Sequence, residues 1–119
     1  YRVDHFYNRI APEKVGEVYA SCDILLKTSL LESFSYPPLE MMATGGVAVV
    51  LPNDGNVEYL RDGENCLFYK QGDLADAVEK ITRVVEDPAL RQKLIRQGRQ
   101  TAEAYQWENM EAGVRALYE

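Results

Sequence analysis

Short, uninterrupted apolar runs recur along the chain between stretches of helical period. The runs are Ile24–Leu26, Val47–Leu51 and Cys66–Tyr69. Uninterrupted apolar runs are typical of strands that are covered on both faces, as in a parallel sheet. Near the start, Val3–Tyr7 has aromatic or branched residues at alternate positions, which predicts one more strand. We therefore expect a mostly buried parallel sheet.

Helical patterns separate these runs. Pro12–Glu13 opens the first helix, because proline is tolerated in the first helical turn, and its apolar side is formed by Val15, Val18 and Tyr19. Pro37–Pro38 opens a second helix, which reaches Thr44 and which Gly45–Gly46 should end. Strands and helices thus alternate, as they do in α/β proteins.

Further helices are predicted after the strand at Val47–Leu51. A turn at 52–55 leads to a short predicted helix near 57–60, and Asp73 should cap a longer one. Asp87–Pro88 begins the next helix. The predicted inward residues are Leu74, Val78, Ile81 and Val85 in the helix after Asp73, Leu90, Leu94 and Ala102 in the next, and Met110, Val114 and Leu117 in the last.

This pattern predicts an α/β fold, a Rossmann-like parallel sheet with flanking helices and a helical C-terminal third. With 119 residues there is room for one hydrophobic core, so residues 1–119 are expected to form a single unit. A composition of 46% hydrophobic and 27% charged residues is that of a water-soluble globular domain. The net charge of −6 argues against nucleic acid as a partner, although a helix N-terminus can still bind a small phosphorylated ligand.

The cysteines and the single histidine give no metal-ligand spacing. Cys22 and Cys66 lie far apart beside apolar residues, which favours buried free thiols in a reducing compartment over a disulfide. The longest apolar run is far too short to span a bilayer, so a cytoplasmic location is expected. The chain begins at Tyr1 without an initiator methionine, which we interpret as an internal cut in a longer protein.

Two glutamates surround the start of the helix at Pro37. In open α/β sheets ligands bind at the carboxyl ends of strands, and Glu32 lies in the loop after Ile24–Leu26, with Glu40 one turn inside the following helix. Between them, backbone amides approach the positive end of a helix dipole, which can receive phosphate oxygens. Ionised carboxylates accept hydrogen bonds from sugar hydroxyls. A purely structural interpretation also exists, since glutamate is common near helix starts.

The whole run from Thr28 to Gly45 resembles the signature of retaining GT-B glycosyltransferases. That signature has two glutamates separated by seven residues, an aromatic and a small residue after the first, and Ala-x-Gly after the second. The likeness extends upstream through Val3–Leu26. Downstream it includes Val47–Leu51, Asp62–Asn65, Gly72–Asp73 and the aromatic-x-Trp element Tyr105–Trp107. Nearly the whole chain is covered, which makes the functional interpretation the stronger one.

The resemblance assigns roles to individual residues. It implies that Glu32 faces the hydroxyls of the donor sugar as the catalytic residue, while Glu40 binds the ribose hydroxyl pair. The backbone amides of Phe34, Ser35 and Tyr36 would hold the diphosphate. The leaving phosphate itself would accept the proton of the acceptor, so no protein nucleophile is implied.

The resemblance also places Tyr7, Asn8 and Arg9 beside the base of the nucleotide, and it implies chemistry without a metal or another cofactor. One departure from the pattern affects the site directly, because Pro37–Pro38 removes two backbone donors where many relatives have N–H groups. The run Ser-Tyr-Pro-Pro-Leu-Glu looks like a rhamnosyltransferase-type variant, which suggests a deoxysugar donor.

Taken together, we expect a partial donor domain of a retaining glycosyltransferase of polysaccharide biosynthesis. The parent would transfer a hexosyl or deoxyhexosyl group from a nucleotide diphosphate sugar to a carbohydrate or lipid-linked acceptor held by an N-terminal domain, at the inner face of the membrane. The fragment alone should be inactive and should self-associate. The main alternative is a non-catalytic nucleotide-binding or response-regulator-like α/β module, and a pure protein-interaction domain is a third.

Overall fold

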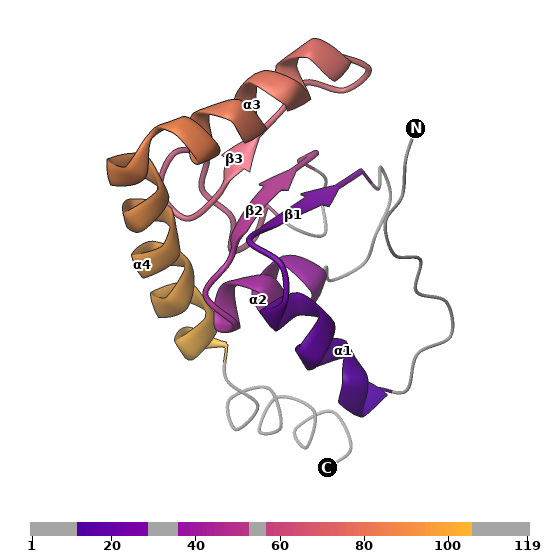
Figure 1. Cartoon of the computed structure of the whole chain (residues 1–119), viewed down its shortest axis with the longest axis vertical. Helices are drawn as coiled ribbons and strands as arrows, with labels where there is room; N and C mark the ends of the chain where they lie inside the picture. Colours follow the sequence, from indigo (N-terminus) through magenta and orange to yellow (C-terminus); the bar gives the residue numbers. More distant parts are fainter. Residues whose placement is uncertain (1–11, 29–35, 53–56, 106–119) are drawn as a thin grey trace.

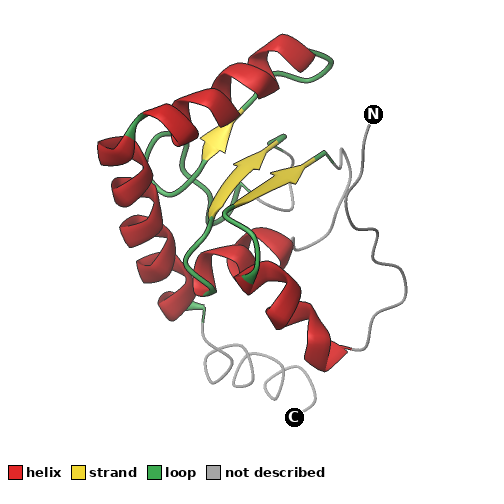
Figure 2. Cartoon of the chain, viewed as in Figure 1, coloured by secondary structure: helices red, strands yellow, loops and turns green. Residues whose placement is uncertain are grey.

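The computed structural model describes residues 12–28, 36–52 and 57–105, and in these ranges a parallel sheet lies between helices (Figures 1 and 2). The predicted strand at Val3–Tyr7 and the predicted last helix lie outside the described residues. The described elements are α1 (Pro12–Ala20), β1 (Ile24–Lys27), α2 (Tyr36–Ala43), β2 (Val47–Val50), β3 (Leu67–Phe68), α3 (Leu74–Glu86) and α4 (Pro88–Ala104). The predicted α/β class is confirmed.

The three strands are parallel and lie in the order β1-β2-β3. Ile24 pairs with Val47, and Val49 pairs with Leu67. All four residues of β2 are buried, as predicted for a strand covered on both faces. The central strand is therefore the axis of the hydrophobic core.

Successive side chains of β2 point to opposite faces of the sheet, because a strand has a period of two. Val47 and Val49 join a cluster with α3 and the first half of α4, whereas Ala48 and Val50 join a cluster with α2 and the second half of α4. Figure 1 shows α3 on one side of the sheet, α1 and α2 on the other, and α4 running along the side from one layer to the other. The fold thus has two cores joined by one helix.

Helix ends are set by local chemistry that the sequence reveals. The Asp73 carboxylate accepts a hydrogen bond from the backbone N–H of Asp76 at 2.9 Å, and Asp87 accepts one from the N–H of Leu90 at 3.0 Å. Both aspartates are N-caps, which was predicted for Asp73, and the predicted start of a helix at Asp87–Pro88 is confirmed. After α2, Gly45 adopts a φ of 87°, a left-handed conformation that favours glycine.

A buried asparagine joins the chain before β3 to α4. The Asn65 amide donates to the carbonyl of Tyr59 and to the hydroxyl of Thr101, each at 2.9 Å, and its oxygen accepts the backbone N–H of Arg61 at 2.8 Å. The hydroxyl of Thr101 in turn donates a hydrogen bond to the carbonyl of Gln97 at 3.0 Å. Because each of these buried groups has a partner, the network stabilises the amino-terminal end of β3.

The prediction that β1 is covered on both faces is wrong for the described part of the chain. Its four residues are only half-buried or exposed, and Leu26 is 42% exposed. The reason is the placement of the helices, since α3 and α4 pack on β2 and leave much of β1 uncovered. Ile24 alone packs against the cluster beneath α3.

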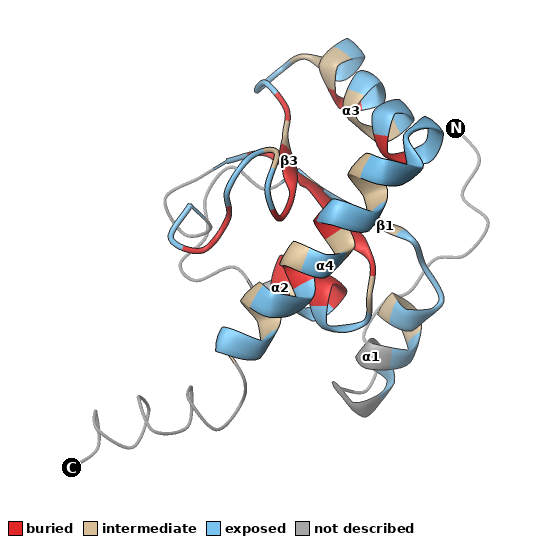
Figure 3. Ribbon diagram, turned by 90° about the vertical axis from the view of Figure 1, so that its left-hand side faces the viewer, coloured by how far each residue is buried: buried red, intermediate tan, exposed pale blue. Residues whose placement is uncertain are grey.

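The predicted inward face of α3 is also wrong. Leu74, Val78 and Val85 are exposed, and the buried residues are Ala77 and Val84 with Ile81 partly buried beside them. Figure 3 shows the outer side of α3 as exposed. Ile81 belongs to both apolar faces of this helix, so the helical period alone does not decide which face turns inward. Polar contacts at the start of α3 fix the rotation, as described below.

Three smaller expectations differ from the structure. Residues 57–59 form a turn instead of a helix, because Asn65 accepts the N–H of Arg61 and ends the local pattern there. The third strand is limited to Leu67–Phe68, although Cys66 forms an isolated parallel bridge with Asp62. Both cysteines are free, as predicted, but Cys22 is exposed and only Cys66 is buried.

Candidate functional site

The carboxyl ends of all three strands are tied to one backbone oxygen. The carbonyl of Lys27, the last residue of β1, accepts the backbone N–H of Leu51 at 3.1 Å and the phenol of Tyr69 at 3.2 Å. Tyr69 directly follows β3, and this residue is 9% exposed. Burial raises the pKa of Tyr69, so its hydroxyl remains a neutral donor. This arrangement fixes the point at which the chain leaves β1.

Helix α2 begins at this same edge. The chain passes from the carboxyl end of β1 to α2 and returns through β2, which is parallel to β1, so the N-terminus of α2 lies at the carboxyl ends of the strands. Pro37 is half-buried and Pro38 is buried in the first turn. The positive end of the helix dipole thus faces the edge where open α/β sheets bind ligands, with two fewer N–H donors than usual.

Glu40 is exposed in the second half of this eight-residue helix. It forms no ion pair with any residue of the described ranges. Its neighbour on α1 is Tyr19, whose pKa is raised by burial and, to a lesser extent, by the negative charge of Glu40. The carboxylate therefore lies within electrostatic reach of α1 while it remains open to solvent. An exposed, unpaired carboxylate can accept hydrogen bonds from the hydroxyls of a ligand.

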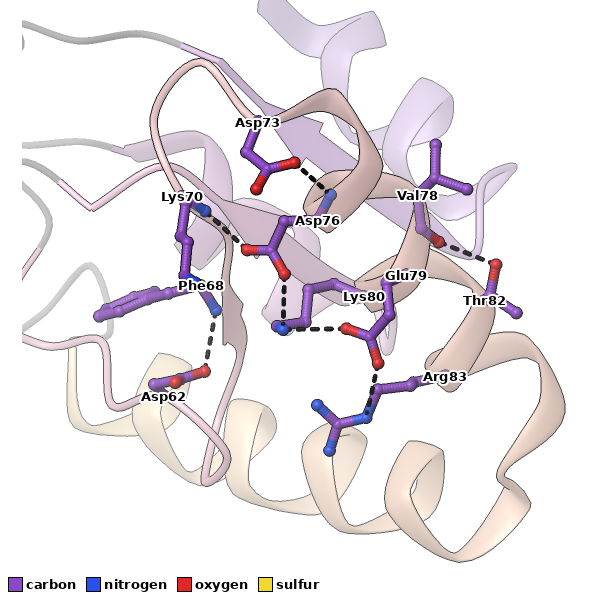
Figure 4. A network of polar contacts seen from close by, with 10 residues as sticks. All are labelled: Asp62, Phe68, Lys70, Asp73, Asp76, Val78, Glu79, Lys80, Thr82 and Arg83. Atoms are coloured by element: carbon purple, nitrogen blue, oxygen red, sulfur yellow. Dashed lines mark hydrogen bonds and ion pairs between the residues drawn. The ribbon is translucent and has the colours of Figure 1, made fainter.

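A polar network holds the connection between β3 and α3 (Figure 4). The Asp76 carboxylate accepts the backbone N–H of Lys70 at 2.8 Å and the ammonium of Lys80 at 2.9 Å. The hydrogen bond from Lys80, followed by that from Lys70, lowers the pKa of Asp76. The hydrogen bonds that Lys80 forms with Glu79 and Asp76 in turn raise the pKa of Lys80. This network was not predicted from the sequence, although the i,i+4 spacing of Asp76 and Lys80 indicates an ion pair.

The network sets the rotation of α3. Asp76 must face the strand end to reach Lys70, and one residue later Ala77 then turns toward the sheet. The exposed position of Val78 follows from the same geometry. Asp62 acts in a similar way beside it, because its carboxylate accepts the backbone N–H of Phe68 at 2.9 Å. These carboxylates bind backbone groups of their own chain and are structural.

Several predicted site residues lie outside the described residues. Glu40 is the predicted residue whose side chain the structure describes, and Tyr36 is described as the first residue of α2. The roles of the other predicted residues remain predictions. These residues are Tyr7, Asn8, Arg9, Glu32, Phe34 and Ser35. Among the described residues, no three His, Cys, Asp or Glu side chains lie close enough together to hold a metal ion. In the same ranges, no helix combines the length and apolar character that crossing a membrane requires.

Comparison with known proteins assigns the chain to a family. Residues 4–101 match the family described as Glycosyl transferases group 1. The D-inositol 3-phosphate glycosyltransferase of Acidothermus cellulolyticus is 31% identical over 107 residues, which are 90% of this chain and 24% of that protein. The chain spans 23% to 30% of the length of the first curated relatives that it matches.

Solved structures agree on the fold. The C-terminal domain of LpcC, a group 1 family glycosyl transferase from Francisella tularensis, is 21% identical with a TM-score of 0.74, over 83% of this chain and 51% of that one. HepE from Anabaena, solved in complex with UDP-glucose, is 22% identical with a TM-score of 0.69, over 74% of this chain and 24% of that one. The chain belongs to the group 1 glycosyl transferases and corresponds to part of the C-terminal domain of their GT-B fold.

Proposed function

We propose that this chain is the donor-binding part of a retaining glycosyltransferase that uses a nucleotide diphosphate sugar. The observation that carries the proposal is Glu40, an exposed carboxylate that forms no ion pair with any described residue. It lies on a helix that begins at the carboxyl edge of the sheet, inside the segment that matches the family. In this proposal Glu40 accepts hydrogen bonds from the ribose hydroxyls. The capture of UDP-glucose by HepE supports a donor of this class.

The other roles follow the order of groups in such a donor. The backbone amides of Phe34, Ser35 and Tyr36 hold the diphosphate near the helix N-terminus, where the dipole favours negative charge. Glu32 lies closer to the sugar and stabilises the reacting centre, where charge develops in the transition state. The leaving phosphate accepts the proton of the acceptor, and Glu32 orients the sugar without forming a covalent bond to it.

The acceptor is held by another part of the protein. This chain covers about a quarter of the length of its relatives, and the half-covered β1 leaves an apolar strand surface that further chain can complete. The acceptor is a carbohydrate or a lipid-linked sugar, and the transferred group is a hexose or deoxyhexose. A cytoplasmic location at the inner face of the membrane, self-association of the isolated chain and its lack of transfer activity all stay predictions.

A non-catalytic nucleotide-binding or response-regulator-like module is the alternative. Such a module has the same alternation of strands and helices but no need for two glutamates at one helix start. In that case Glu40 would be expected in an ion pair that stabilises the fold. Its exposure, and the lack of an ion pair with any described residue, favour the glycosyltransferase instead.

Two substitutions in the full-length protein test the division of roles. Glu40→Gln replaces an ionised acceptor by a neutral one, and hydrogen bonds to charged groups contribute about 1.5 to 3 kcal/mol, so affinity for a nucleoside diphosphate should fall roughly tenfold or more. Calorimetry with UDP, GDP and dTDP measures this. Glu32→Gln should lower turnover more than nucleotide affinity, because its partner is the sugar.

The matched control is Glu86→Gln, the same chemical change at an exposed position at the end of α3. It should leave both affinity and turnover unchanged. Unchanged affinity in Glu40→Gln would remove Glu40 from the ribose. Parallel losses in the Glu32 and Glu40 variants would contradict the proposed division between sugar and ribose.

A further inference from the structure

Helix α4 carries a row of positive side chains on the side that faces away from the sheet. This basic face consists of Lys93, Arg96 and Arg99, which are all exposed, and a spacing of three residues brings neighbours in the row to one side of the helix. The other exposed residues from 89 to 100 are neutral, and the carboxylate of Glu103 lies at the end of the row. Figure 3 looks onto α4 and shows pale blue, exposed residues along its outer side.

The basic face differs from the neighbouring helix because its cations have no carboxylate partner. On α3, Lys80 lies 2.9 Å from carboxylate oxygens of both Asp76 and Glu79, and Arg83 lies 3.7 Å from Glu79. The three cations of the basic face form no ion pair with any residue of the described ranges. Because the whole chain has a net charge of −6, the basic face is a local reversal of sign.

The basic face lies away from the candidate donor site. The hydroxyl of Thr101 on α4 accepts a hydrogen bond from Asn65, which precedes β3, so α4 is attached to the amino-terminal end of the sheet. In Figure 1 the arrows of β1 and β2 point away from α4. A partner that covers the basic face therefore leaves the carboxyl edge of the sheet open.

We propose that the basic face of α4 docks on an anionic lipid surface. Each Lys or Arg held near such a surface strengthens binding about fivefold, and the neutral side chains between the cations let the helix approach the headgroups without bringing a carboxylate with it. The outer side of a helix is a convex ridge, which suits a flat surface better than a peptide that needs a groove. This inference goes beyond the proposed function and does not depend on donor binding.

Nucleic acid is a poorer partner for the same face. Three cations neutralise few phosphates, and the remaining charge of the chain is negative and repels the rest of the phosphate backbone. An acidic protein is the other partner that the cations could attract, and the test below separates it from a lipid surface.

The test is binding of the full-length protein to vesicles, followed by co-sedimentation. Vesicles of equal parts phosphatidylglycerol and phosphatidylcholine should bind it, vesicles of phosphatidylcholine alone should not, and binding should weaken as salt is raised. Lys93→Gln/Arg96→Gln should weaken binding to the anionic vesicles roughly tenfold or more. Arg99 is kept in this variant, because its guanidinium lies against Gly45 at the end of α2 and its loss would also change the packing there.

The matched control is Lys14→Gln/Arg83→Gln. It removes one lysine and one arginine from exposed positions of α1 and α3, so both double variants have the same net charge. The control should bind anionic vesicles within about twofold of wild type, because its charges do not face the lipid in the proposed orientation. The difference between the two double variants therefore locates the contact on α4.

A second readout places the helix at the lipid surface. Gln92→Cys introduces a thiol at an exposed position next to the basic face. Its reaction with a water-soluble maleimide should slow roughly fivefold or more when anionic vesicles are in excess. The native Cys22, which is exposed before β1, should react at the same rate with and without vesicles.

Each outcome decides for or against the proposal. Absence of binding to anionic vesicles at low salt, equal losses in the two double variants, or unchanged reactivity of Gln92→Cys overturns it. Retention on immobilised polyglutamate without vesicle binding also overturns it and assigns the face to an acidic protein. Glu40→Gln should bind vesicles like wild type while it loses nucleotide affinity, so a failure of the proposed function is seen separately.

Discussion

The two ends of the sheet are held by different kinds of contact. At the amino-terminal end, Asn65 is 6% exposed and bonded on all sides, and Gly46 packs tightly against Met41, which is fully buried. At the carboxyl-terminal end, Tyr69 and Asp76 bind backbone groups close to the surface. The N-terminus of α2 lies at this second end, and Glu40, which is exposed and forms no ion pair with any described residue, follows on the same helix.

This difference indicates that residues at the amino-terminal end stabilise the fold, whereas residues at the carboxyl-terminal end serve ligand binding. Buried polar groups with complete hydrogen bonding are costly to disturb, because each partner left behind loses its bond inside the protein. Groups near the surface can exchange a lost partner for water at little cost. Substitutions at the amino-terminal end should therefore destabilise the protein, whereas those at the carboxyl-terminal end should mainly change ligand binding and catalysis.

The largest effect is expected for Asn65→Ala. This change leaves the N–H of Arg61 and the carbonyl of Tyr59 without their buried partner, and it should lower the free energy of unfolding by about 2–4 kcal/mol. Chemical denaturation measures the loss. The neighbouring change Gln100→Ala, at an exposed position of α4, should shift it by no more than about 0.5 kcal/mol. A loss below about 1 kcal/mol in Asn65→Ala would contradict the claim that the amino-terminal end of the sheet is the end that determines stability.

A smaller loss is expected for Gly46→Ala. A methyl group at Gly46 would collide with the end of the Met41 side chain and would lie 2.8 Å from its sulfur. Met41 is buried completely, so it can move only by disturbing its neighbours, and overpacking of this kind costs about 1–3 kcal/mol. Gly63→Ala provides a contrast, since nothing lies near its added methyl and only its φ of 78° opposes the change. Equal stability of wild type and Gly46→Ala would show that the packing there is loose.

The smallest effect is expected at the carboxyl-terminal end, for Asp76→Asn. The pKa of Asp76 is lowered from 3.8 by Lys80 and Lys70, so its carboxylate stabilises the folded state above the unfolded pKa. That contribution is lost as the pH falls through the folded pKa. The melting temperature of Asp76→Asn should thus be below that of wild type at pH 7, and the gap should close below about pH 3.8. A gap that is constant with pH would assign the effect to packing instead of charge.

Sequence patterns predicted those features that depend on local chemistry. The prolines and glycines at the two ends of α2 restrict the backbone directly, and Asp73 and Asp87 cap helices through bonds to residues three positions away. The central strand was equally clear, because a fully apolar run leaves few alternatives.

The predictions were wrong where contacts between different elements determine which residues are buried. Ala77 and Val78 both belong to apolar faces of α3, and only the contact of Asp76 with Lys70 determines which one is buried. The link from Tyr69 to Lys27 spans 42 positions and leaves no periodic signal. For the candidate site, the sequence predicted the place of Glu40 on α2, while the nearness of Tyr19 depends on how α1 packs against α2.

The two thiols differ so much that they can serve as separate chemical reporters. Burial raises the pKa of Cys66 to about 12, and its side chain is inaccessible, so alkylating reagents cannot reach a thiolate there until the core opens. Cys22 is exposed just before β1. Since the chain has two cysteines in all, a maleimide dye should label Cys22 alone under native conditions. The slow modification of Cys66 would then report the opening of the core of this chain, without any engineered probe.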